Sequence, residues 1–238
     1  MRQYVGWHGQ KWTTLSRLSR DHKNVVEKVE QDLYSIVTEP EFAIGQRAFL
    51  VRTAQGNILW DCISYLDDET ERKVRNLGGV DYIAISHPHY YSLMIQWSEA
   101  FDNAPILIHE LDRRWISYHS PNIKLWSGVK FPLLKDLTLV NLGGHFDGGT
   151  VLHWKKVGGG ILLSGDIIAV AMDRRWASFM YSFPNMIPLS RSKIEQIMER
   201  ISPFRFQKLY SAFDGKEILS DALNAVRRSA KRYIRFIS

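Results

Sequence analysis

Residues Ile83–Met94 read IAISHPHYYSLM and place two histidines directly after a predicted strand. The apolar run that enters this stretch, Tyr82–Ile85, is typical of a buried strand. Pro88 cannot donate a ladder hydrogen bond, so we expect the strand to end before it. His87 and His89 would then lie at the C-terminal end of a strand, where α/β proteins build their sites. Neutral imidazole is a favoured ligand of zinc and iron, so the pair predicts a metal site; the alternative is a turn with two solvated histidines.

The composition is that of an ordinary globular protein. Of the 238 residues, 45% are hydrophobic and 24% are charged, which suits one medium domain or two small ones. The net charge of +6 permits binding of nucleic acid or of an anionic substrate but does not require it. Cys62 is the only cysteine, which excludes a disulfide within the chain and a cysteine-based zinc cluster, and which fits a reducing compartment.

The sequence contains no targeting or membrane segment. The N-terminus lacks the apolar core of a secretory signal. Nowhere does an apolar run reach the roughly 18 residues that a membrane span needs. We therefore expect a cytoplasmic protein with no membrane contact.

Before the histidines, the pattern predicts an arm, a short helix and several strands. In order, we expect an irregular arm (1–12), a helix (13–20), further helical turns at Val25, Val26 and Val29, a strand (33–37), a hairpin (47–53 and 57–63) and a helix (69–77). Asp61 falls at the end of the second hairpin strand. It either caps a turn there or orients a metal ligand from behind.

After the histidines, two further candidate ligands follow predicted strands. His145 lies in the glycine-rich loop GGHFDGG (143–149), which lets the backbone turn sharply. Asp166 follows a hairpin of strands 150–154 and 160–164. His109, at the end of a strand over 105–109, is interpreted as structural. The sequence thus offers His145 and Asp166 as partners for the first two histidines.

The C-terminal part combines an irregular loop with an amphipathic helix. Residues 173–188 are aromatic and basic without a clear period, and they predict either a wall of a substrate pocket or a packed surface loop. A helix is predicted over 217–234, and its basic face is expected to be solvated rather than bound to nucleic acid.

The order of these features resembles the metallo-β-lactamase-fold hydrolase superfamily over roughly residues 33–215. Segments such as GQRAFL and GGHFDGGTVLHW look like an uncharacterised subgroup of it. The resemblance implies a four-layer αββα sandwich with the metal site at one edge of the two sheets, whereas the residues alone give only a mixed α/β or α+β fold. It implies a single domain over 1–238, with an arm and short helix at 1–32 and an amphipathic helix at 216–238.

The chain departs from the family pattern His-x-His-x-Asp-His in its second half. Tyr91 stands in place of the aspartate and Ser92 in place of the third histidine, and Phe213 lies near the place of a late histidine. The resemblance therefore implies one intact metal site, formed by His87, His89, His145 and Asp166, which holds one divalent ion. Zinc is expected first, with iron or manganese as alternatives.

These residues predict a mononuclear hydrolase that uses a metal-bound hydroxide on a small ester, thioester, lactone or amide. Tyr91 and Asp166 are the candidate catalytic residues, and Asp61 supports a ligand. The alternatives are a catalytically impaired metal-binding protein of the same fold and, less favoured, a nuclease. A small-molecule substrate is expected as the partner, and nucleic acid is not. The sequence does not decide the oligomeric state, and a homo-oligomer is one of the options.

Overall fold

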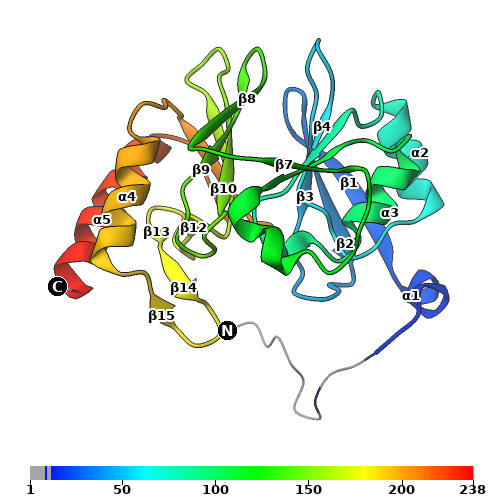
Figure 1. The fold of residues 1–238 in the computed structure, drawn as a ribbon, viewed down its shortest axis with the longest axis horizontal. Helices are drawn as coiled ribbons and strands as arrows, with labels where there is room; N and C mark the ends of the chain where they lie inside the picture. Colours follow the sequence, from blue (N-terminus) through cyan, green and yellow to red (C-terminus); the bar gives the residue numbers. More distant parts are fainter. Residues whose placement is uncertain (1–8, 10–11, 238) are drawn as a thin grey trace.

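The computed structural model describes Gly9 and residues 12–237, which form a mixed α and β fold (Figure 1). The arm predicted over residues 1–12 falls almost wholly outside the described residues. Within them, every helix is too short or too polar to serve as a membrane span.

The first sheet has seven strands in the order β1-β2-β3-β4-β5-β6-β7. They are β1 (Lys23–Glu30), β2 (Leu33–Glu39), β3 (Ala48–Val51), β4 (Ile58–Trp60), β5 (Tyr82–Ala84), β6 (Ile106–His109) and β7 (Ile123–Trp126). Strands β1 to β4 pair antiparallel and β4 to β7 pair parallel. Because β4 and β5 run in the same direction, the residues that follow them meet at one edge, where Asp61 N–H donates to Ala84 O at 2.9 Å.

The second sheet has six strands in the order β17-β16-β11-β10-β9-β8. They are β8 (Lys130–Leu134), β9 (Leu137–Asn141), β10 (Thr150–Trp154), β11 (Ile161–Gly165), β16 (Lys208–Ser211) and β17 (Glu217–Ile218). Two small sheets follow β11, formed by β12 (Ala169–Val170) with β13 (Ala177–Ser178) and by β14 (Met180–Ser182) with β15 (Ile187–Pro188). The predicted hairpins over 47–63 and 150–164 are confirmed as β3–β4 and β10–β11.

One helix precedes the first strand, and the others lie in the connections between strands or at the C-terminal end. They are α1 (Leu15–Asp21), α2 (Asp68–Asn76), the 3₁₀ helix η1 (Pro88–Tyr90), α3 (Met94–Ala100), the 3₁₀ helix η2 (Glu110–Trp115), α4 (Arg191–Ile201) and α5 (Ala222–Ile237). Helix α2 begins where Asp67 accepts a hydrogen bond from Thr70 N–H at 2.7 Å, and it ends before Gly78 at φ 108°.

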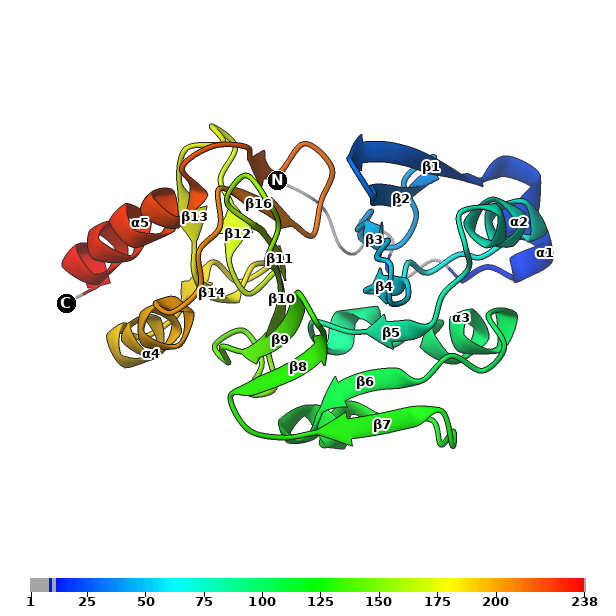
Figure 2. The ribbon, with the colours of Figure 1, turned by 90° about the horizontal axis from the view of Figure 1, so that it is seen from above.

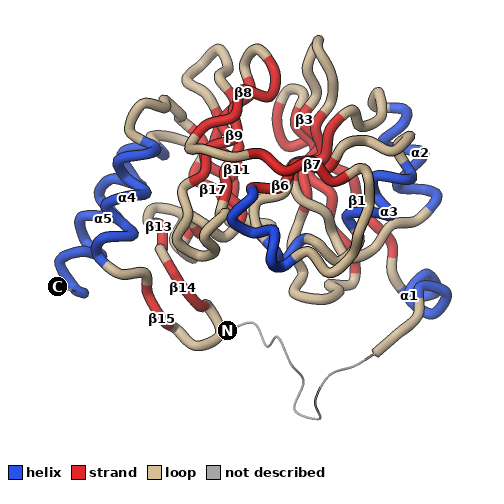
Figure 3. The backbone as a smooth tube through the Cα atoms, viewed as in Figure 1, coloured by secondary structure: helices blue, strands red, loops and turns tan. Residues whose placement is uncertain are grey.

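The helices and sheets form four layers, as predicted (Figures 2 and 3). Apolar side chains of both sheets, such as Trp60 and Leu163, form one buried cluster between them. Trp97 of α3 belongs to a second cluster on the outer face of the first sheet, and Val226 of α5 to a third on the outer face of the second sheet. Each sheet is therefore covered by the other sheet on one face and by helices on the other.

Two predicted elements are wrong in type or extent. Val25, Val26 and Val29, predicted as helical turns, lie in β1, which pairs with β2 through a tight turn in which Asp32 has φ 63°. The spacing of the valines is compatible with a helix and with a strand. Pairing with β2 favours the strand, and β-branched residues such as valine pack well on a sheet.

The C-terminal helix begins at Ala222 rather than at 217. Glu217 and Ile218 form β17, which pairs with Tyr210 and Leu209 of β16. The backbone groups of these residues are satisfied by sheet pairing, so the helix starts only after Asp221.

Candidate metal centre

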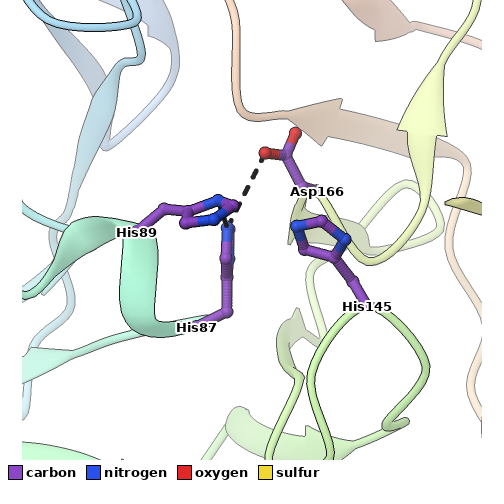
Figure 4. Close-up of side chains that lie close together, drawn as sticks. All are labelled: His87, His89, His145 and Asp166. Atoms are coloured by element: carbon purple, nitrogen blue, oxygen red, sulfur yellow. Dashed lines mark hydrogen bonds and ion pairs between the residues drawn. The ribbon is translucent and has the colours of Figure 1, made fainter. Parts of the chain in front are cut away.

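Four predicted ligands converge at the shared edge of the two sheets (Figure 4). His87 and His89 follow β5, His145 lies between β9 and β10, and Asp166 follows β11. One ligand atom from each lies within 4.8 Å of the others. The structure thus brings together all four of the residues that the sequence proposed as a metal site.

His87 is held by a hydrogen-bonded chain that begins at Asp61. The Asp61 carboxylate accepts Ser86 N–H at 2.7 Å and the Ser86 hydroxyl at 3.0 Å. Ser86 Oγ also lies 2.8 Å from His87 Nδ1. Because the Ser86 proton is donated to Asp61, Ser86 Oγ must accept from His87 Nδ1–H. This arrangement leaves the lone pair of His87 on Nε2, which points into the cluster.

Asp61 lies where it can orient His87 through Ser86, which is one of the two roles that the sequence left open. Its side chain is 1% exposed. Burial raises its pKa well above the ordinary value, and the two hydrogen bonds from Ser86 oppose that rise. A carboxylate buried behind a ligand histidine is the usual partner for fixing an imidazole ring at a metal site.

His145 presents one nitrogen to the cluster. Its Nδ1 lies 3.1 Å from Met180 O, and a carbonyl can only accept, so Nδ1 carries the proton. Its Nε2 is buried and has no hydrogen-bond partner among the described residues. A buried bare nitrogen is costly unless something binds it. A metal ion fits this requirement.

His89 and Asp166 bring the other two candidate ligand atoms close to His87. His87 Nε2 lies 3.1 Å from His89 Nδ1 and 3.7 Å from Asp166 Oδ2. Burial and the neighbouring imidazoles lower the pKa of His87 well below its ordinary value. Burial also lowers the pKa of His145 to about 4. Both rings are thus neutral at pH 7, as metal ligands must be.

A pocket of about 340 Å³ opens beside His89, His145 and Asp166. Its other lining residues include Gln46, Ser64, Ser92, Phe183 and Pro184. Gln46 donates to Ser64 Oγ at 3.3 Å, and Ser64 Oγ lies 3.1 Å from Ser92 Oγ. Ser92, which replaces the third histidine of the family pattern, therefore lines the pocket beside the cluster.

Tyr91, unlike its neighbour Ser92, is not among the residues that line this pocket. Its side chain is 8% exposed and belongs to the apolar cluster between the first sheet and its helices. Burial raises the pKa of the phenol far above its ordinary value, and Asp112 adds to the rise. Tyr91 can therefore serve only as a donor, and its predicted catalytic role stays a prediction.

The segment over 173–188, predicted as an irregular loop, contains β13, β14 and β15 and contributes directly to the site. Phe183 and Pro184 line the pocket, and the carbonyl of Met180 fixes His145. These contacts support its interpretation as a pocket wall. His109 lies elsewhere: its ring bonds Gly128 O at 3.0 Å and accepts Leu111 N–H at 3.3 Å, which agrees with a structural role.

Several supporting groups of the site were not predicted from the sequence. Ser86 links Asp61 to His87, and Gly165 makes room for it, because a Cβ at residue 165 would lie 2.5 Å from Ser86 Oγ. The strand-end position of both residues was visible, but their contact was not. The carbonyl of Met180 is a backbone group, and every residue type carries one, so the sequence does not reveal its role.

The chain resembles known proteins along most of its length. The family model described as "Metallo-beta-lactamase superfamily" matches residues 43–201. "Uncharacterized protein YmaE" of Bacillus subtilis (strain 168) is 51% identical over 241 residues, which cover 100% of this chain and 87% of the relative.

Solved structures share the fold at low sequence identity. The DIM-1 metallo-beta-lactamase superposes with a TM-score of 0.65 at 14% identity, covering 89% of this chain and 98% of that one. The mono-zinc form of the metallo-beta-lactamase FIM-1 from Pseudomonas aeruginosa gives a TM-score of 0.61 at 13% identity, covering 89% and 96%. Both resemblances concern the architecture alone.

Proposed function

The chain belongs to the metallo-beta-lactamase superfamily, and we propose that it is a mononuclear metal-dependent hydrolase of a small ester, thioester, lactone or amide. The observation that supports this most is the buried, unpartnered Nε2 of His145, which faces the cluster formed with His87, His89 and Asp166. Family membership and the donor cluster support a divalent metal and hydrolysis in general. The single ion and the class of substrate are the proposal.

Three imidazoles and one carboxylate suit zinc, and iron and manganese are the alternatives to be tested. A divalent ion, when bound there, supplies a Lewis acid that polarises a carbonyl and acidifies a coordinated water. The chain's part is to keep the histidines neutral and oriented. The Asp61–Ser86–His87 hydrogen bonds do so for His87, and the Met180 carbonyl does so for His145.

Asp166 is proposed to have two roles. Its Oδ2 is near enough to His87 Nε2, at 3.7 Å, to serve in the same ligand set. Its carboxylate also lines the substrate pocket, where it can accept a proton from an attacking water.

A hydrogen-bond donor is proposed in place of the missing second metal. If Gln46 donates to Ser64 Oγ, the Ser64 proton is free to bond Ser92 Oγ. The proton of Ser92, which is an exposed residue, can then point into the pocket. A donor fixed in this way can stabilise the negative charge that develops on a substrate carbonyl oxygen. We favour Ser92 over the buried Tyr91 for this role.

The second candidate function is metal binding without turnover. It is favoured by Tyr91, which occupies the place of the family's aspartate and packs in an apolar core cluster. A protein of this kind would retain the ion and the fold but show no hydrolysis that depends on Ser92.

Elemental analysis of protein purified without chelator tests the metal site first. About one zinc or iron ion per chain is expected, and His87→Ala and His145→Ala should each lose it. Two ions per chain would contradict the mononuclear site. Metal-loaded protein is then screened against esters, thioesters and lactones, with the metal-free protein as the blank.

A further inference from the structure

An apolar groove lies between the β14–β15 hairpin and the end of helix α5, next to the pocket of the metal cluster, with which it shares Phe183 as a wall. Figure 1 shows these two segments near the C-terminus. The groove has a volume of about 760 Å³, within the range of small-molecule sites. Its main walls are Met180, Phe183 and Met186 from the hairpin and Arg232, Tyr233 and Phe236 from the helix. We call it the hairpin–helix groove.

The floor of the groove is formed by packed side chains, and its rim is exposed. Tyr233 OH donates to Met180 Sδ at 3.2 Å, and the Tyr233 ring packs edge-on against Phe179 at 5.6 Å between centroids. At the rim, by contrast, Phe236 is 78% exposed and Met186 is 63% exposed. Large apolar side chains that face water from both sides of a groove mark a place where an apolar ligand gains free energy by displacing water.

One wall carries a positive charge. The Arg232 guanidinium lies 4.0 Å from the centre of the Trp176 ring, which holds it in place by a cation–π contact. No carboxylate in the described part of the chain forms a salt bridge with it. Helix α5 also carries four more basic residues and no acidic one. The groove therefore combines an apolar trough with an uncompensated cation.

We infer that the hairpin–helix groove binds a single-chain anionic amphiphile, with its hydrocarbon chain between Phe236 and Met186 and its anionic group on Arg232. A fatty acid carboxylate has this chemistry. The trough would take the chain, and the guanidinium would pair with the carboxylate at one end. This inference goes beyond the proposed hydrolysis, because binding in the groove requires neither a metal nor turnover.

Titration calorimetry with laurate tests the inference, in metal-free and metal-loaded protein alike. We expect laurate to bind with micromolar affinity to both. Butyrate, which has the anion without the chain, and dodecyltrimethylammonium, which has the chain with the opposite charge, should bind at least about tenfold more weakly. Binding of the cation as tight as that of laurate would show a non-specific apolar surface and overturn the inference.

Variants locate the ligand. Arg232→Gln and Phe236→Ser should each weaken laurate about tenfold or more. Lys231→Gln removes the same charge from the neighbouring exposed position, which does not line the groove, and should change the affinity less than twofold. Met186→Ser gives a second rim variant on the hairpin.

Each variant is first checked for an unchanged heat-unfolding midpoint. Equal laurate affinity in all four variants would place the ligand elsewhere and refute the assignment. Co-sedimentation with phosphatidylglycerol vesicles that is lost in Lys231→Gln and kept in Phe236→Ser would indicate a membrane-facing basic surface instead, and would also refute it.

Discussion

Gly165 and Ser86 are in contact across the two sheets, so close that a methyl group on residue 165 would lie 2.5 Å from Ser86 Oγ and 3.5 Å from His87 Nδ1. This contact joins the end of β11 to the end of β5 behind the metal cluster. The spacing of the ligands therefore depends on a residue that binds no metal.

Gly165→Ala should weaken metal binding by roughly 10- to 100-fold, as is typical when the support of a ligand histidine is lost. The added methyl group displaces Ser86 and breaks its bond to His87. Competition with a chromophoric zinc chelator measures the loss.

Gly79→Ala is the matched control for this prediction. Gly79 has φ +74° and Gly165 has φ +51°, but a Cβ at residue 79 meets no atom within 4 Å. Both variants should lose on the order of 1 kcal/mol from backbone strain. Only Gly165→Ala should lose metal affinity, and equal affinities would show that the contact does not support the site.

Ser86→Ala should also weaken metal binding by roughly 10- to 100-fold, for a different reason. His87 Nδ1 loses its acceptor, so the ring is no longer held with its lone pair on Nε2. Asp61 also loses the hydroxyl donor. The same chelator competition gives the affinity.

Ser98→Ala controls for the cost of deleting a buried hydroxyl. Ser98 is fully buried in helix α3 and donates to Ala104 O at 2.7 Å, and it is not among the residues that line the pocket beside the cluster. Both alanine variants should lose about 1 kcal/mol of unfolding free energy. If Ser98→Ala lowers zinc affinity as much as Ser86→Ala does, general destabilisation is the cause and the orienting role of Ser86 is wrong.

The metal-free protein should lose stability as the pH falls from about 6.5 to about 4. Burial lowers the pKa of His145 from 6.5 to about 4 in the fold. In this interval the unfolded chain binds a proton on this ring and the folded chain does not, so acid favours unfolding. At about 1.4 kcal/mol per pKa unit, the effect of His145 alone is on the order of 3 kcal/mol.

Urea unfolding of metal-free protein at several pH values measures this dependence. His145→Gln removes the titrating group, so the difference in unfolding free energy between wild type and variant should shrink as the pH falls. A difference that stays constant between pH 7 and pH 4 would show that His145 is not held neutral by the fold.

Much of the metal site could be predicted because its ligands share a simple signal. His87 stands three residues after the end of β5, Asp166 stands directly after β11, and His145 stands in a glycine-rich loop that follows β9. The ends of these strands, from both sheets, meet at the shared edge of the two sheets, so residue type and strand-end position were enough to propose the four residues. The four-layer architecture, by contrast, came from the resemblance, because short strands and helices permit many arrangements.

The supporting contacts could not be predicted, since they depend on distances between remote segments. Ser86 and Gly165 meet only because both sheets pack face to face, and Met180 acts through its carbonyl. The error at Val25, Val26 and Val29 has a local cause, because three valines at this spacing fit a helix face as well as a strand. Pairing of β1 with β2 decides for the strand, and that pairing is not visible in the local pattern.

Ser92→Ala should reduce kcat/KM for an activated ester by about 10- to 100-fold while leaving the metal content at that of the wild type. Ser92 lines the pocket, and its hydroxyl is proposed to stabilise charge on the substrate oxygen. Its loss removes a donor that acts mainly in the transition state, so kcat should fall more than KM changes.

Tyr91→Phe is the comparison that decides between neighbouring residues. The Tyr91 side chain is 8% exposed and packs in an apolar cluster, so phenylalanine should be accepted with little change in kcat. Gln46→Leu removes the donor to Ser64 and should reproduce a part of the Ser92→Ala defect, because the direction of the Ser64 and Ser92 protons is then no longer fixed. A large loss of kcat in Tyr91→Phe, with full activity in Ser92→Ala, would restore Tyr91 as the catalytic donor and refute the assignment to Ser92.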